Sequence, residues 1–74
     1  MPDIDFELTR DFIELNQLLK LAGICDSGGA GKALVAQGIV QVDGQPESRK
    51  TAKIRAGQVV TCGDARIVVN APKR

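Results

Sequence analysis

The stretch that decides the fold is residues 15–38, LNQLLKLAGICDSGGAGKALVAQG. Its first part carries an apolar stripe at helical spacing, made of Leu15, Leu18, Leu19 and Ala22. This spacing predicts a helix that ends at Gly23, because glycine readily takes the left-handed conformation that follows a helix. Ser27 or Asp26 can cap a second helix by accepting from its exposed amides. Gly38 is expected to end that helix, so the stretch predicts two helices joined by a short turn.

One side of the second helix is expected to pack against the first. That side is traced by Ala30, Ala33, Leu34 and Gln37. Small side chains at a helix crossing let two helices approach closely. We therefore expect the alanines, Ala33 among them, to lie between the helices.

Strands are predicted on both sides of the helical stretch. Residues 4–8 alternate apolar and acidic side chains, the period of a half-buried strand, whereas residues 12–14 fit either a strand end or an early helical turn. The residues after the helices are expected to form a strand at 40–42, a turn at Asp43-Gly44, a polar loop over 45–52, a short strand at 53–55, and a hairpin of 58–62 with 65–69. Helices that are segregated from hairpins along the chain predict an α+β fold.

The composition indicates one small folded domain over residues 1–74, with residues 70–74 expected to fray. The chain is 43% hydrophobic and 26% charged, and it has no histidine, which excludes Ser–His and Cys–His catalysis. Cys25 and Cys62 form no C-x-x-C pair, so zinc is not expected. Both are interpreted as small buried hydrophobes, although a disulfide stays open. No apolar run suits a membrane span and the acidic N-terminus does not suit a signal peptide, so a cytoplasmic location is expected.

Residues 27–32, SGGAGK, invite comparison with a phosphate-binding loop but lack its spacing. A P-loop needs a glycine five positions before the Gly-Lys pair and Ser or Thr after it, where this chain has Asp26 and Ala33. Glycines at a helix start still leave backbone amides uncovered, so an anion can approach them with Lys32 nearby. The alternative is that these glycines only permit tight helix packing.

The charge is distributed unevenly along the chain. Up to Asp26 there are six acidic and two basic residues, and after it there are eight basic and three acidic residues. Such asymmetry is typical of a polyanion-binding surface, or simply of a solvated one. Phe6 and Phe12, the only aromatic residues, lie in apolar patterns and are expected in the core. Nucleic acid would therefore be bound through shape and backbone rather than by base stacking.

Several sequence blocks occur in a recognisable order. They are Leu15-x-x-Leu18-Leu19-Lys20-x-x-Gly23, Ser27-Gly28-Gly29 with Lys32-Ala33, Gly38-x-Val40-x-Val42-Asp43-Gly44, Glu47-x-Arg49, Lys53-Ile54 and Gly57-x-x-Val60. Together they resemble the RNA-binding domain of the ribosomal protein S-four type, and more closely the small free-standing YbcJ-like bacterial proteins. The resemblance covers about residues 12–62. It implies two helices packed on a small antiparallel sheet, the alpha-L RNA-binding motif.

The resemblance also implies a function. The chain would be a small RNA-binding module, not an enzyme and without a cofactor, that recognises structured RNA, either ribosomal or transfer RNA. The RNA-contacting residues would be Lys20, Ser27, Gly28, Gly29, Lys32, Arg49, Lys50 and Lys53. Gly28 stands where many members of the wider family have arginine, a difference that the YbcJ-like proteins share. The chain is expected to be a monomer that can join a ribosome or another RNA–protein assembly. The alternative is a protein–protein module that uses the same helix start and loop.

Overall fold

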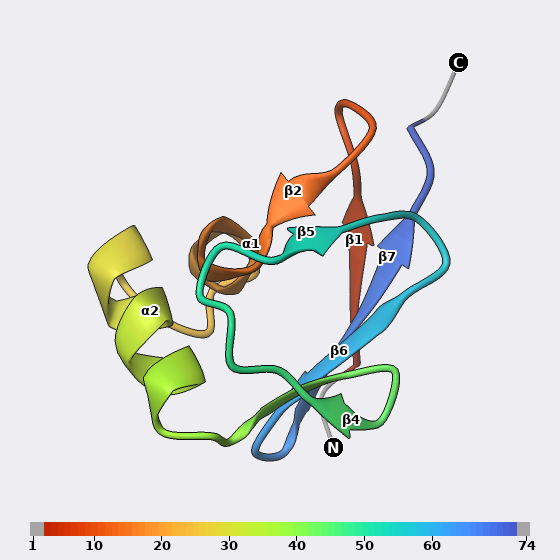
Figure 1. The fold of residues 1–74 in the computed structure, drawn as a ribbon. Coiled ribbons are helices and arrows are strands. Elements are labelled where there is room, and N and C mark those ends of the chain that lie inside the picture. Colours follow the sequence, from red (N-terminus) through yellow and green to blue (C-terminus); the bar gives the residue numbers. More distant parts are fainter. Residues whose placement is uncertain (1–2, 73–74) are drawn as a thin grey trace.

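The computed structural model describes residues 3–72 as two helices beside a set of short strands (Figure 1). The elements are β1 (Asp3–Glu7), β2 (Ile13–Glu14), α1 (Leu15–Leu21), α2 (Gly28–Ala36), β3 (Val40–Val42), β4 (Gln45–Pro46), β5 (Lys53–Ile54), β6 (Val59–Cys62) and β7 (Ala65–Asn70). The helices pack against each other beside a mostly antiparallel sheet, which confirms the predicted α+β class. The ambiguous residues before α1 form the short strand β2.

The main sheet has the strand order β1-β7-β6-β3-β4, and β2 pairs with β5 separately. These pairs are antiparallel except for β1 with β7, which is parallel and sets Ile4 beside Ile67 and Phe6 beside Val69. The predicted antiparallel sheet is thus extended by one parallel pair. Because apolar and acidic residues alternate along β1, its apolar side faces the core and its carboxylates face solvent.

Helix α1 is positioned by its leucine stripe and capped by a distant loop. The three leucines of the stripe are fully buried. Glu14 precedes the helix and makes no capping hydrogen bond with its side chain. Instead, Leu15 N donates to Ala52 O at 2.9 Å and Asn16 N donates to Lys50 O at 3.1 Å. The segment before β5 therefore satisfies the first amides of α1 in place of a side chain.

Helix α2 begins and ends where the sequence predicts. Ser27 is extended, with φ −153°, and its Oγ accepts a hydrogen bond from Ala30 N at 3.1 Å. Gly38 follows the helix with φ 78°, in the left-handed region. Both ends are thus fixed by local residues.

The buried side of α2 differs from the predicted side. Ala33 and Gln37 are exposed, and Gly31 and Val35 are the buried residues of the helix. The physical reason is the closeness of the helix crossing: a Cβ atom at Gly31 would lie 2.6 Å from the carbonyl oxygen of Asn16. Only glycine fits such an approach, so the prediction that Ala33 lies between the helices is wrong. Of the rest of the predicted side, Ala30 and Leu34 are half-buried, and Leu34 packs against the core.

The first predicted hairpin has its turn at Asp43-Gly44, and its second strand follows at once, where a loop over 45–52 was predicted. Asp43 and Gly44 have φ of 53° and 82°, the left-handed pair of a type I′ turn, and Gln45–Pro46 returns as β4 rather than as loop. The second predicted hairpin is present as β6 and β7. Asn70, expected to begin a frayed tail, is instead paired with Glu7. The rest of that expectation concerns a tail whose residues 73–74 lie outside the described part of the chain.

The core is aliphatic, as predicted, and the two cysteines behave differently. Cys62 is buried and Cys25 is half-buried, and both are free thiols. Burial raises the pKa of the Cys62 thiol. Within residues 3–72, no helix is long and apolar enough to cross a membrane, and no cluster of three or more potential metal ligands occurs.

Candidate nucleic-acid interface

The start of α2 leaves two backbone amides open. Ala30 N donates to Ser27 Oγ at 3.1 Å, and Gly31 N donates to Ser27 O at 3.0 Å. Within residues 3–72, the N–H groups of Gly28 and Gly29 have no acceptor. The outer side is open, because a Cβ atom at Gly29 would meet only Ser27 Oγ, at 3.9 Å. Both amides lie at the positive end of this nine-residue helix, where the helix dipole favours an anion, and the approach is open on the side of Gly29.

The inner side of the same helix start is packed against Asn16 of α1. The Asn16 side chain is 3% exposed, its Nδ2 donates to Gly28 O at 3.5 Å, and its Oδ1 has no partner among the described residues. A Cβ atom at Gly28 would lie 3.1 Å from Gln17 Nε2 and 3.3 Å from Asn16 Nδ2. A larger residue at position 28 would have to displace the side-chain amides of Gln17 and Asn16, so glycine fits this position.

The basic loop, residues 49–53, also contacts Asn16. The bond from Asn16 N to Lys50 O ties this loop to the residue that also contacts Gly28. Lys50 is itself exposed. The α2 start and the basic loop therefore meet at Asn16, a residue that the sequence-based site did not include.

Two further lysines of the predicted site lie one helical turn away from Asn16 and Gly28. Lys20 follows Asn16 by four residues in α1, and Lys32 follows Gly28 by four residues in α2. Residues four apart share one face of a helix. Both lysines are exposed, so they can extend the same surface as positive charges.

Arg49, in contrast, is already paired. Its Nε and Nη2 donate to the two carboxylate oxygens of Glu47 at 3.2 and 3.3 Å, and its backbone N donates to Glu47 Oε2 at 3.0 Å. The side-chain hydrogen bond from Arg49 lowers the pKa of the Glu47 carboxyl. Arg49 therefore offers less unneutralised charge than its position in the sequence suggests.

Lys53 points toward Phe12 on the β2–β5 ladder. Its Nζ lies 5.0 Å from the centre of the Phe12 ring, and Arg10 Cζ and Arg55 Cζ lie 5.3 and 5.7 Å from the same centre. We call these four residues, Arg10, Phe12, Lys53 and Arg55, the Phe12 patch. The Phe12 side chain is half-buried, so the expectation that it belongs to the core is wrong in this respect. Phe6 is half-buried and packs against the core, as expected.

Three acidic residues near the N-terminus lie on strand β1. Asp3, Asp5 and Glu7 are exposed on β1, an edge strand whose partner is β7. Glu7, at the end of β1, also lines a cavity together with Arg10 and with Gln17 of α1. Half of the six acidic residues that precede Ser27 thus lie on this edge strand.

The S4 domain sequence model matches residues 6–70. The chain belongs to the S4 domain family. The match extends beyond the predicted residues 12–62 at both ends, so it takes in the last two residues of β1 and all of β7 of this S4 domain.

Relatives of this S4 domain occur in distant bacteria. "Putative RNA-binding protein YbcJ" of Escherichia coli (strain K12) is 51% identical over 49 residues, which cover 66% of this chain and 70% of that protein. "Probable ribosome maturation protein RlbA" of Bacillus subtilis (strain 168) is 38% identical over 53 residues, or 72% of this chain and 75% of that protein. None of these names is that of an enzyme.

A solved structure supports the fold assignment. The solution structure of YbcJ from E. coli, described as containing an αL motif involved in RNA binding, superposes on this S4 domain with a TM-score of 0.72. It is 43% identical in sequence and covers 90% of this chain and 86% of its own. The predicted alpha-L fold is therefore confirmed.

Sequence reasoning missed Arg10 and Arg55 of this S4 domain, although a signal for them exists. Ile13 pairs with Ile54 in the β2–β5 ladder, so the same register sets Phe12 opposite Arg55. Alternate residues share a face of a strand, which adds Lys53 and, beyond β2, Arg10. The period-two spacing was visible, but the pairing of the two segments was not.

Proposed function

We propose that this S4 domain binds structured RNA, ribosomal or transfer RNA, through phosphate and shape contacts at the α2 start and the basic loop. The observation that carries the proposal is the pair of open amides at Gly28 and Gly29 beside exposed lysines. Backbone amides and lysines contact phosphates without reading sequence. The same surface joins two rigid helices to an anchored loop, and double-stranded or folded RNA is recognised mainly by shape.

The named relatives support the same ligand class. YbcJ is described in terms of RNA binding, and the name of the B. subtilis relative refers to ribosome maturation. We therefore propose that the chain acts as a cytoplasmic monomer that can associate with ribosomal particles. No catalytic step is proposed.

A salt titration of affinity tests this proposal. The probes are unfractionated bacterial transfer RNA and an RNA hairpin of unrelated sequence. Four phosphate contacts, from Lys20, Lys32, Lys50 and Lys53, would give a slope of log affinity against log salt near −3, at about 0.7–0.9 for each contact. Replacement of each lysine by alanine should reduce the magnitude of the slope by about 0.7–0.9, the value for one contact. It should weaken the binding of both probes alike.

Arg49→Ala is the matched comparison within the same loop. Because Arg49 is paired with Glu47, its removal should change the slope less than Lys50→Ala does. Unchanged slopes in all four lysine variants would place the RNA face elsewhere. No binding of either probe at low salt would favour the alternative of a protein–protein module, whose mostly apolar interface would show little salt dependence.

A further inference from the structure

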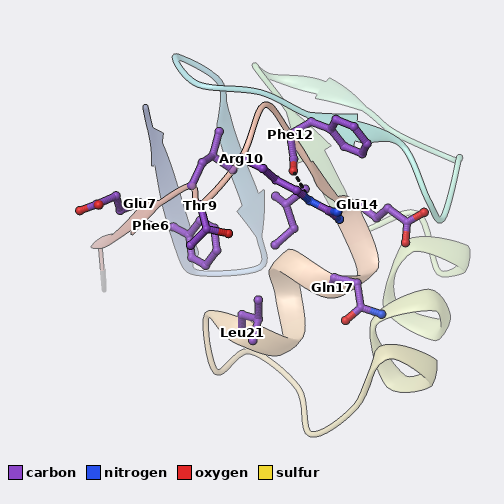
Figure 2. A pocket seen from close by; sticks show the side chains of 10 residues that line it. Phe6, Glu7, Thr9, Arg10, Phe12, Glu14, Gln17 and Leu21 are labelled. Atoms are coloured by element: carbon purple, nitrogen blue, oxygen red, sulfur yellow. Dashed lines mark hydrogen bonds between the residues drawn. The ribbon is translucent and has the colours of Figure 1, made fainter. Parts of the chain in front are cut away.

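The Phe12 patch gathers three cations around one aromatic ring. Each cationic centre lies within 5.7 Å of the ring centre, so no two of them are more than about 11 Å apart. Figure 2 shows Arg10 reaching away from the β1–β2 connection, with its Nε donating to the Phe12 carbonyl oxygen at 3.3 Å. The backbone and ring of a single residue thus hold Arg10 in place.

None of the three cations forms an ion pair with a carboxylate among residues 3–72, although Glu7 and Glu14 line the same cavity as Arg10 and Phe12. The ion pairs of residues 3–72 join Arg49 to Glu47 and Arg66 to Asp3. Glu14 lies across the ladder from Lys53 but forms no ion pair with it. Like charges at such separations repel one another within the screening length of about 10 Å at 0.1 M salt. A bound polyanion would relieve that repulsion.

The patch is continuous with the proposed RNA face. Lys53 belongs to both the basic loop and the Phe12 patch. At its other end the loop is bonded to Asn16, which contacts Gly28 at the α2 start. A shallow hollow of about 460 Å³ lies along this connection, lined by Arg49, Thr51, Ala52 and Lys53. One ligand strand can therefore pass from the open amides, along the loop, to the ring.

We propose that Arg10, Lys53 and Arg55 form a second phosphate-contact patch, so that bound RNA continues past the basic loop and across the β2–β5 ladder. This inference rests on the proposed function. The Phe12 ring positions the cations by cation–π attraction, which reduces the side-chain freedom that binding would otherwise remove. The partner is the RNA backbone, and sequence is not read here.

Charge-removing variants of the full chain test the patch in the same titration with transfer RNA. Arg10→Gln with Arg55→Gln should reduce the magnitude of the salt slope by about 1.4–1.8, two phosphate contacts. The matched control is Arg66→Gln, which removes an exposed arginine at the far end of the β1–β7 pair. It should leave the slope unchanged. Thermal unfolding of each variant shows that it is folded.

A second variant separates charge from positioning. Phe12→Leu keeps an apolar side chain and all three cations, so the slope should stay the same. Affinity should fall about two- to fivefold, because the cations are no longer held in place by the ring and must be ordered on binding. Unchanged affinity would overturn the role of the ring. If the double arginine variant kept the salt slope of the unmodified protein while the lysine variants still reduced it, the patch would be overturned. The proposed function would then still stand. If Arg66→Gln reduced the slope by about half as much as the double variant, the loss per charge would be the same. The effect would then be one of net charge, and the patch would be overturned.

Discussion

At the start of α2 the groups that can meet a phosphate are main-chain amides, whereas at the Phe12 patch they are the ends of long side chains. The amides of Gly28 and Gly29 have positions fixed by the helix, and Asn16 packs directly behind them. The cations of the patch stand on exposed residues around a half-buried ring. Fold and binding therefore share residues at the α2 start and are separable at the patch. The former should tolerate few substitutions and the latter many.

The largest expected effect on stability is that of Gly31→Ala. The added Cβ atom would lie 2.6 Å from the Asn16 carbonyl oxygen, and such overpacking costs about 1–3 kcal/mol. This loss should outweigh the gain in helix propensity of up to about 1 kcal/mol. Urea unfolding measures the difference. The control is Gly29→Ala, whose Cβ atom meets open space apart from Ser27 Oγ and which should not destabilise. Equal stability of both variants would contradict the close helix crossing.

An intermediate effect is expected at Ser27. Ser27→Ala removes the acceptor for Ala30 N and should lower the free energy of unfolding by about 1 kcal/mol. Ser27→Asp keeps a capping oxygen, so stability should be retained, but it places a negative charge beside the open amides. RNA affinity should then fall further in Ser27→Asp than in Ser27→Ala. If Ser27→Ala lowered RNA affinity more than Ser27→Asp, the proposed phosphate contact at the α2 start would be contradicted.

A smaller effect on stability, with a gain in binding, is expected from Glu47→Gln. The pKa of the Glu47 carboxyl is lowered by its hydrogen bond from Arg49, so this pair stabilises the fold above the ordinary carboxyl pKa and ceases to do so as the pH falls through the lowered value. Exposed pairs contribute little, so stability at neutral pH should hardly change. The freed Arg49 should steepen the salt slope by about 0.7–0.9. The control is Asp64→Asn, which lies in the β6–β7 turn and changes the net charge by the same amount as Glu47→Gln. It should leave the salt slope unchanged.

The smallest effect is expected for Ala33→Leu. Ala33 is exposed, and alanine and leucine have similar helix propensities, so the free energy of unfolding should stay within about 0.5 kcal/mol. A loss as large as that of Gly31→Ala would mean that α2 packs through its alanines after all. Denaturant midpoints of the two variants decide between these faces.

Local signals account for what the sequence predicted correctly. The leucine stripe of α1, the cap at Ser27 and the Asp43-Gly44 turn each depend on neighbouring residues, and each is present in the structure. The fold class follows from the order of such elements. The role of the residues at the α2 start in binding RNA stays a prediction, which rests on the local chemistry of a glycine-rich helix start and on the family resemblance.

What the sequence did not predict depends on residues far apart in the chain. The rotation of α2 is set by the approach of Gly31 to Asn16, which no periodicity within α2 reveals. The Phe12 patch needs the pairing of β2 with β5. Each miss is therefore a contact between segments rather than an error about a segment.

The parallel pairing of β1 with β7 has a consequence for how the protein is made. A ribosome releases β1 first and β7 last among the strands, so the edge of the sheet cannot close until residues 65–70 have emerged. Until then Ile4 and Phe6 have no partner strand. Asp3, Asp5 and Glu7 alternate with them, and charges placed in this way discourage a lone strand from pairing with a neighbouring chain. The acidic residues of β1 are thus expected to keep the nascent polypeptide from pairing with other chains until β7 has emerged.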